Sequence, residues 1–180
     1  GSHTMFLAAL DDRVTVSAPV VMVSSYFSGG CPCESGRGLH LCANGTNNAE
    51  IASITAPRPQ LIISDGEDWT KDVPEVEFPF IQRTYGFYNQ KGAVQNAHFP
   101  KEGHDYGVSK RMALYPFMAK YLGLNLDKVK NESKQNLSKQ DAIEYVRDNI
   151  VDVVLLDESM PGITGLQTLQ QIKEIKSNLP

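Results

Sequence analysis

The sequence predicts an α/β fold in which parallel strands are joined by helices. Short apolar runs bounded by Pro, Gly or Asp are typical of buried strands, and residues 60–64 are the clearest of them. Segments with apolar residues at helical spacing alternate with these runs, and such alternation favours parallel strands joined by right-handed crossovers. After Gly123 the chain becomes rich in Lys, Asn, Ser and Gln, which is typical of a linker between two parts.

The first elements in the chain are a helix and a strand. We expect an apolar helix at residues 2–10 and a β-branched, almost uncharged strand at residues 14–24. Residues 26–48 show no periodicity, so we expect a long loop there. A short helix at residues 49–56 should stop at the prolines that follow it.

The next elements alternate without interruption. The strand at residues 60–64 leads to a helix at 75–88, and a strand at 94–99 leads to an amphipathic helix at 109–122. Gly123 marks the end of that helix.

The end of the chain repeats the pattern once. We expect a helix at residues 139–149, a strand at 151–156 that ends at Asp157, and a helix at 166–175. These elements form a small helix-strand-helix unit.

Composition argues against several classes of partner. The 180 residues carry a net charge of −4, which gives no reason to expect nucleic acid or an anionic membrane as a partner. No apolar run approaches the roughly 20 residues that cross a bilayer. The first residues also lack the pattern of a signal peptide.

Three cysteines, Cys31, Cys33 and Cys42, fall in the expected loop. Their C-x-C spacing differs from that of zinc and thioredoxin-like sites, so we expect thiols without a metal. A disulfide from Cys42 to Cys31 or Cys33 is the alternative in an oxidising compartment.

Four acidic residues, Asp65, Glu67, Asp68 and Asp72, follow the strand at residues 60–64. A carboxylate just beyond a parallel strand lies at the edge of the sheet where α/β folds hold their chemistry. We place Asp68 there, with Asp65 and Asp72 as competitors and Glu67 as a weaker one. The alternative is that all four acids only solvate a turn.

A candidate base follows the next strand. His104 lies in the turn Glu102-Gly103-His104-Asp105, and an acid followed by a histidine is the chain order of one class of hydrolytic triad. His98 is the alternative base, although a histidine at a strand end is more often packed or hydrogen-bonded. His3 is a further candidate neighbour of the site.

Residues 2–122 resemble the C-terminal half of an α/β-hydrolase, most closely the acetylxylan-esterase-like esterases. The resemblance rests on the segments SHTMFLAALDDRV, APVVMVS, CPCESG, APRPQLIISDGEDWTKDVPEVEFP and FPKEGHDYG, in that order. It implies hydrolysis of a small-molecule or polysaccharide ester by a Ser-His-Asp triad without a cofactor. Asp68 would accept the imidazole Nδ1–H, and His104 would act as general base and then general acid.

The nucleophile does not appear in these residues. In the family, the motif G-x-S-x-G immediately precedes a helix like that at residues 2–10, and Gly1 matches its last glycine. The resemblance therefore places the serine upstream of residue 1, together with strands that supply an oxyanion donor, so we expect little catalysis. Ser2 has no strand before it, Ser35 lacks the leading glycine, and Ser64 follows a strand but has Ile62 in place of that glycine.

Residues 138–180 resemble the middle of a response-regulator receiver domain, through the segment DAIEYVRDNIVDVVLLDESMPGITGLQTLQQIKEI. The resemblance implies that Asp157 is the phospho-acceptor and a Mg²⁺ ligand, with a histidine kinase as partner. The acidic pair expected on an earlier strand is absent, and the later hydroxyl residue and lysine would lie beyond Pro180. We therefore expect inefficient phosphorylation, and the alternative is that Asp157 is a surface acid.

The sequence thus predicts a partial parallel α/β-hydrolase sheet with flanking helices at residues 1–123, a linker at 124–137, and an incomplete receiver-like unit at 138–180. The favoured function is that of an esterase fragment without its nucleophilic serine, inactive as it stands; the alternative is a phosphorelay receiver module. The two resemblances imply a bacterial source, an exported hydrolase part and a cytoplasmic receiver part. Both resemblances are cut at places that break their sites, so we favour a chain that joins pieces of two genes.

Overall fold

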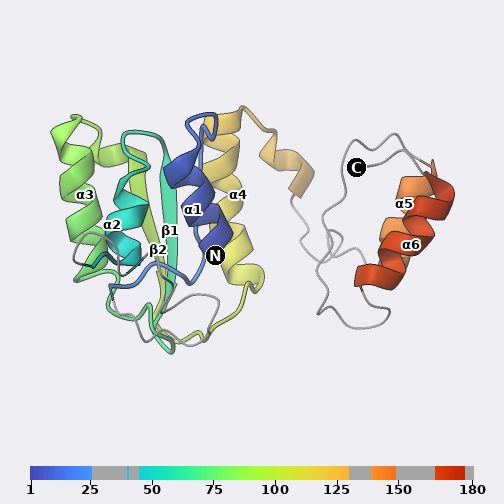
Figure 1. Ribbon diagram of the computed structural model, residues 1–180, viewed down its shortest axis with the longest axis horizontal. Coiled ribbons are helices and arrows are strands. Elements are labelled where there is room, and N and C mark those ends of the chain that lie inside the picture. Colours follow the sequence, from blue (N-terminus) through green and yellow to red (C-terminus); the bar gives the residue numbers. More distant parts are fainter. Residues whose placement is uncertain (26–39, 41–44, 130–138, 149–164, 177–180) are drawn as a thin grey trace. The chain divides into compact units, whose positions relative to one another are not determined.

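The computed structural model describes residues 1–25, 40, 45–129, 139–148 and 165–176 (Figure 1). The chain forms two compact units, Gly1–Lys128 and Val129–Pro180. The first unit has the α/β fold that the sequence predicts.

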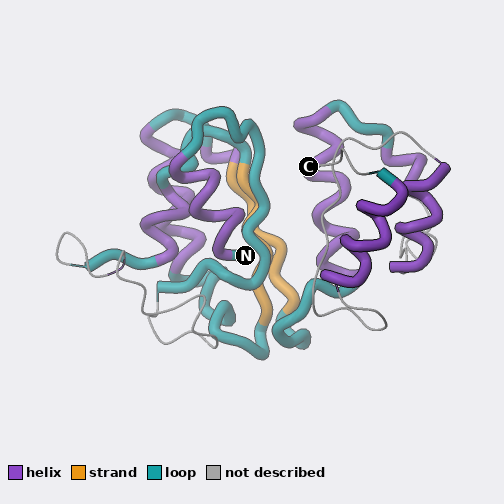
Figure 2. Tube along the Cα trace, turned by 45° about the vertical axis from the view of Figure 1, so that its right-hand side comes forward, coloured by secondary structure: helices purple, strands orange, loops and turns teal. Residues whose placement is uncertain are grey.

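A parallel pair of strands forms the centre of the first unit. Strand β1 (Gln60–Asp65) is buried along its whole length and pairs with β2 (Val94–Phe99), from Gln60 opposite Val94 to Asp65 opposite Phe99. Helix α3 (Glu77–Phe87) and the short 3₁₀ helix η2 (Lys91–Ala93) complete the crossover between them (Figure 2). Strand β2 has the predicted bounds, and β1 is one residue longer than predicted.

The continuous strand predicted at residues 14–24 is not formed. This segment runs parallel to β1 through two isolated bridges, from Ser17 to Gln60 and from Val20 to Ile63. Pro19 has no N–H to donate, and Val21 adopts a left-handed φ of 45°, which a β-branched residue rarely does. These two residues interrupt the ladder that the apolar composition suggested.

Helices cover both faces of the strands. Helices α1 (Ser2–Leu10), α2 (Asn48–Ser53) and α3 pack on one face, and α4 (Val108–Leu122) packs on the other. Side chains of β1 alternate accordingly: Ile62 joins the core of the first face, whereas Leu61 and Ile63 contact Phe117 of α4.

Two helix ends differ from the prediction, and one matches it. Helix α2 ends three residues early, at Ser53, and is followed by turns and a cis bond before Pro57. Helix α3 begins two residues late, because the amides of Val76 and Phe78 bond to carbonyls in the preceding turn. Helix α4 ends at Gly123, whose φ of 65° is the left-handed conformation that the sequence indicated.

The second unit contains α5 (Lys139–Asp148) and α6 (Gly165–Ile175), which pack through Ile143, Val146 and Ile172. The 3₁₀ helix η3 (Leu126–Val129) lies in the predicted linker. The predicted strand at 151–156 and Asp157, like all three cysteines, lie outside the described residues.

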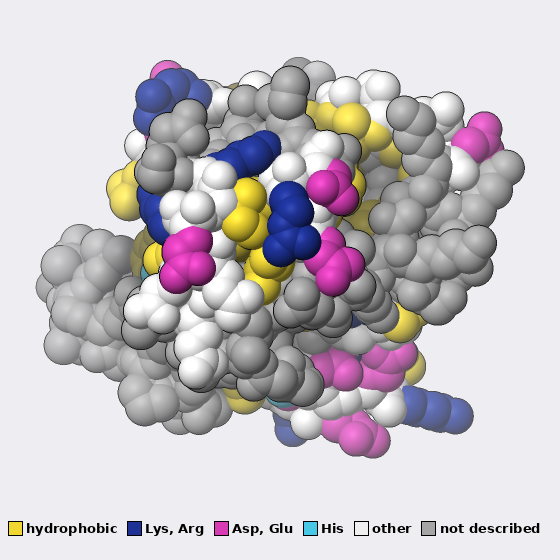
Figure 3. All heavy atoms as spheres, turned by 90° about the vertical axis from the view of Figure 1, so that its right-hand side faces the viewer, with side chains coloured by type: hydrophobic (Ala, Val, Ile, Leu, Met, Phe, Trp, Pro, Cys, Tyr) yellow, Lys and Arg dark blue, Asp and Glu magenta, His cyan; other side chains and the backbone are white. Residues whose placement is uncertain are grey.

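Surface charge is mixed on the face drawn in Figure 3, where basic and acidic side chains lie interspersed among hydrophobic ones. Among the described helices, none combines the length and apolar character needed to cross a bilayer.

Candidate active site

Asp68 lies in the turn after β1, and its side chain is only 2% exposed. Its Oδ1 accepts hydrogen bonds from the amide and the hydroxyl of Thr70, at 2.6 and 2.5 Å. The Thr70 hydroxyl oxygen in turn accepts the Asp65 amide at 2.9 Å. One oxygen of the carboxylate is therefore held by the turn, and the other, Oδ2, is left to face a partner.

That partner is His104, in the turn after β2. Its Nδ1 lies 3.1 Å from Asp68 Oδ2, and its side chain is 43% exposed. The indole of Trp69 packs on the imidazole with 4.2 Å between ring centroids. The structure places side by side the two residues that sequence reasoning selected.

Backbone hydrogen bonds join the two turns that carry this pair. The Gly66 amide donates to the Phe99 carbonyl at 2.9 Å, and the Glu67 amide donates to the Glu102 carbonyl at 3.1 Å. The first bond follows the register of β1 and β2, and the second joins the two turns beyond the strands, so the carboxylate and the imidazole meet at the carboxyl end of the sheet.

This geometry has a defined chemical consequence. A carboxylate that accepts the Nδ1–H fixes the imidazole tautomer and leaves the Nε2 lone pair available as a base. It also stabilises the imidazolium that forms when Nε2 takes a proton.

The competing acid Asp65 has a different partner. Its Oδ2 lies 3.2 Å from Lys110 Nζ, and both side chains are completely buried. Burial raises the pKa of Asp65, and the hydrogen bond and charge of Lys110 oppose that rise. The Asp65 carboxylate is thus engaged with α4.

The alternative base His98 also has a different partner. Its Nδ1 lies 2.9 Å from the hydroxyl oxygen of Ser64, which also accepts the Asn96 side-chain amide at 3.0 Å. Ser64 is completely buried on β1, and Ser2 is buried in α1, whereas His3 is exposed on the same helix.

Lys110 is a residue of this region that sequence reasoning missed. It is completely buried, and its Nζ donates to Glu102 Oε2 at 3.1 Å, to the Gly103 carbonyl at 3.2 Å, and to Asp105 Oδ1. Burial lowers the pKa of Lys110, but hydrogen bonds to Asp105, Glu102 and Asp65 outweigh it and raise the pKa above its ordinary value. No sequence pattern signals this, because a lysine on an amphipathic helix is expected to face solvent.

His104 opens into a cavity of about 410 Å³. Gly1 and Thr4 at the start of α1 line the same cavity, as do Val20 and Val21 beside β1. The beginning of the chain and the imidazole therefore face a common space.

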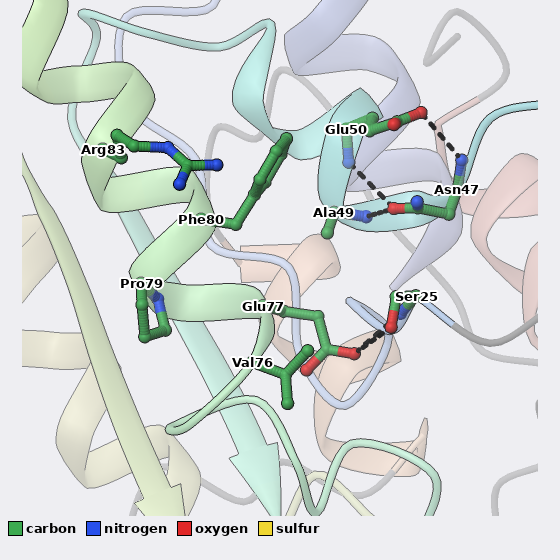
Figure 4. A pocket seen from close by; sticks show the side chains of 9 residues that line it. All are labelled: Ser25, Asn47, Ala49, Glu50, Val76, Glu77, Pro79, Phe80 and Arg83. Atoms are coloured by element: carbon green, nitrogen blue, oxygen red, sulfur yellow. Dashed lines mark hydrogen bonds between the residues drawn. The ribbon is translucent and has the colours of Figure 1, made fainter.

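A second cavity, of about 380 Å³, shares no described lining residue with the first (Figure 4). There the Glu77 carboxylate accepts hydrogen bonds from the amide and hydroxyl of Ser25, at 2.8 and 2.7 Å. The guanidinium of Arg83 lies 5.4 Å from the centre of the Phe80 ring.

Within the described ranges, no group of three or more His, Cys, Asp or Glu side chains is placed to hold a metal ion. Asp157, the predicted Mg²⁺ ligand and phospho-acceptor, lies outside those ranges.

Both the α/β fold and the end of the chain are similar to known proteins. The family model of the response regulator receiver domain matches residues 116–180. A stretch of 33 residues, 18% of this chain, is 54% identical to the Response regulator UvrY of Escherichia coli (strain K12) and covers 15% of that protein. The same protein from Shigella flexneri matches equally.

Two solved structures are similar to the fold. Methylesterase BT1017 matches 74% of this chain with a TM-score of 0.68 and 56% sequence identity, and the match covers 30% of that protein. A carbohydrate esterase family 15 glucuronoyl esterase from Caldicellulosiruptor kristjansonii matches 68% of the chain with a TM-score of 0.51 and 18% identity, over 41% of its own length.

The fold and these similarities define the class. The chain combines an esterase-like α/β part with a part that matches the model of the response regulator receiver domain. It spans less than a third of the methylesterase and less than a sixth of the response regulator that it matches.

Proposed function

We propose that the first unit is the acid–base part of a carboxylic-ester hydrolase of the Ser-His-Asp type, with Asp68 as the acid and His104 as the base. The observation that carries this proposal is the 3.1 Å contact between His104 Nδ1 and Asp68 Oδ2 at the carboxyl end of two parallel strands. The similarity to a methylesterase at 56% identity supports it.

The chemistry follows from the tautomer. His104 Nε2 takes the proton of a serine hydroxyl as its oxygen attacks the ester carbonyl, and then gives that proton to the departing alkoxide. Water, deprotonated by the same nitrogen, then attacks the acyl-enzyme, the bond to the serine oxygen breaks, and the imidazolium returns the proton to that oxygen as the acid is released. Asp68 remains ionised and stabilises each imidazolium.

The triad also needs a serine nucleophile. No G-x-S-x-G motif occurs in the sequence. Gly1 and His104 line one cavity, so a segment that enters at Gly1 would bring its side chains to the imidazole. The substrate is a small-molecule or polysaccharide ester, and the similarity to the methylesterase favours a methyl ester.

A chimaera tests this function. The segment of Methylesterase BT1017 that aligns with the first unit is replaced by that unit, and methyl-ester hydrolysis is measured. The chimaera should hydrolyse the ester, and His104→Ala should lower kcat by about 10⁶-fold. A folded chimaera whose activity does not depend on His104 would refute the role of His104.

The isolated 180-residue chain provides the complementary assay. With a chromogenic acetyl ester, we expect the wild-type chain and the His104→Ala variant to show the same background rate of hydrolysis. Turnover that His104→Ala removes would show that a residue of this chain acts as the nucleophile.

A phosphorelay receiver module is the second candidate function, favoured by the family match over residues 116–180. Asp157 would be its phospho-acceptor, and a histidine kinase its partner. A complete receiver domain would use Mg²⁺ to offset the charge of the arriving phosphoryl group. Of the acidic ligands expected for Mg²⁺, the sequence contains Asp157 but lacks the acidic pair of an earlier strand. A single carboxylate makes a poor Mg²⁺ site.

Acetyl phosphate tests this second function. We expect acetyl phosphate to give the wild-type chain no more phosphoryl label than the Asp157→Ala variant. Labelling that depends on Asp157 would establish the receiver activity. The two parts also imply different compartments, export for the hydrolase and cytoplasm for the receiver, which is consistent with a chain that joins pieces of two genes.

A further inference from the structure

Lys110 forms the centre of a cluster of charges beneath the histidine turn. It lies in the first turn of α4, and its ammonium group faces three carboxylates from two segments: Asp65 at the end of β1, and Glu102 and Asp105 in the turn after β2. The Phe99 ring lies 5.9 Å from Nζ and closes the side toward the strand. A buried lysine is costly unless its charge is paired, and here three carboxylates pair it.

The partners of Lys110 lie on both sides of His104 in the sequence. Glu102 and the Gly103 carbonyl precede the imidazole, and Asp105 follows it. Asp65 lies three residues before Asp68, on the strand that positions the acid turn. One ammonium group thus connects the turn that carries the base to the strand that carries the acid.

Backbone hydrogen bonds join the His104 turn to the acid turn, but few side chains orient the imidazole itself. The imidazole is 43% exposed, and the side chains that orient it within the described part of the chain are Asp68 and Trp69, both from the acid turn. Asp105 and Glu102 are themselves partly exposed, so the surface alone would leave them mobile. The buried ammonium group is the partner that the two carboxylates share, beside the Ser109 hydroxyl on Glu102 and the Gly107 amide on Asp105.

We propose that Lys110 is a positioning residue, which holds the turn of His104 so that Nδ1 stays directed at Asp68 and the Nδ1–H tautomer is kept. This inference rests on the proposed acid–base pair and adds a residue on α4 that neither touches substrate nor belongs to the triad. Lys110 acts through His104 alone.

Measuring the tautomer of His104 tests this role, because a residue that only stabilises the fold would not change the tautomer. Two-bond ¹H–¹⁵N correlation spectra of the full chain at about pH 9, above the ordinary histidine pKa of about 6.5, distinguish Nδ1–H from Nε2–H imidazoles. His104→Gln identifies the His104 signals. The wild-type chain should show the Nδ1–H tautomer.

Lys110→Met should lose the Nδ1–H signature and give a mixture of tautomers, as in an imidazole with no fixed partner. Lys120→Met is the matched control, because Lys120 is exposed on the same helix, and it should keep the signature. A folded Lys110→Met chain that keeps the Nδ1–H tautomer would overturn the proposal.

A second variant decides the matter if Lys110→Met does not fold. The double variant Glu102→Ala, Asp105→Ala removes the two side chains that connect Lys110 to the turn but leaves its buried contact with Asp65. It should also lose the Nδ1–H signature, and retention would contradict the proposal.

Asp68→Ala separates the two claims. It should remove the Nδ1–H signature whatever Lys110 does. If Asp68→Ala leaves the signature intact, the acid–base pair itself is wrong; if it removes the signature and the Lys110 variants do not, only the positioning role fails.

Discussion

Asp68 and His104 are oriented by neighbours whose own side chains do no chemistry. Thr70 holds one oxygen of the Asp68 carboxylate through its amide and its hydroxyl. Trp69 covers one face of the imidazole. The carboxylate can therefore present only Oδ2 to His104, which is the arrangement that a general base needs.

The charge cluster around Lys110 gives stability a dependence on pH. The Ser109 hydroxyl and Lys110 lower the pKa of Glu102, and Lys110 and the Gly107 amide lower the pKa of Asp105, from ordinary values of 4.5 and 3.8. A lowered pKa in the folded state contributes stability that is present above the ordinary value and lost as pH falls through the folded value. The raised pKa of Asp65 acts in the opposite direction.

We therefore expect the free energy of unfolding to fall as pH drops below about 4.5, the range in which Glu102 and Asp105 take up protons. Asp105→Asn should weaken this dependence, because it removes one of the two groups. Urea unfolding at a series of pH values measures it, with Asp12→Asn, an exposed aspartate, as control. An unchanged slope in Asp105→Asn would show that the pair with Lys110 contributes nothing.

The sequence was sufficient to select Asp68 and His104 but not Lys110. The first two follow strands in a recognisable order, and the resemblance to the acetylxylan-esterase-like esterases favoured Asp68 over the other acids of its turn. Burial of Lys110 depends on carboxylates 5, 8 and 45 residues away in the chain, brought together only by packing. The same reason kept Asp65 open as a competitor until its partner was known.

The two turns beyond β1 and β2 approach each other at Gly66. A Cβ at this position would lie 2.1 Å from the Pro100 carbonyl oxygen and 2.6 Å from its carbon, both of them backbone atoms. Any side chain here would push the histidine turn away from the acid turn. The glycine is needed for this close approach.

Gly66→Ala should accordingly destabilise the first unit by about 1–3 kcal/mol, the usual cost of overpacking. Gly103→Ala is the matched control, because its Cβ would meet no atom within 4 Å. Thermal unfolding of the two variants measures the difference. Equal midpoints would show that the turns separate without cost.

Strands and helices were predicted where the local pattern agrees with the packing. Strand β2 and helix α1 have the predicted bounds, because apolar spacing and end signals coincide there. The strand predicted at residues 14–24 is wrong, because a β-branched composition does not indicate that Pro19 and Val21 interrupt the hydrogen-bond ladder. In α4, Phe117 and Ala119 are buried, whereas Met112 and Leu122 are exposed.

The sequence passes from one part to the other near α4. The receiver match begins at residue 116, inside that helix, yet Phe117 packs against Leu61 and Ile63 of β1. Residues 116–122 therefore belong structurally to the esterase-like unit. The first compact unit extends to Lys128, which lies between the predicted boundaries at 123 and 138. Those boundaries stay predictions.

The claim on which the account depends is that Asp68 acts through His104. Asp68→Asn and Asp72→Asn in the chimaera with the methylesterase test it most directly, because both residues lie in one acid turn and only Asp68 contacts the imidazole. Asp68→Asn should lower kcat by about 10⁴-fold, through the wrong tautomer, and Asp72→Asn should leave kcat unchanged. A large loss in Asp72→Asn with full activity in Asp68→Asn would contradict the claim.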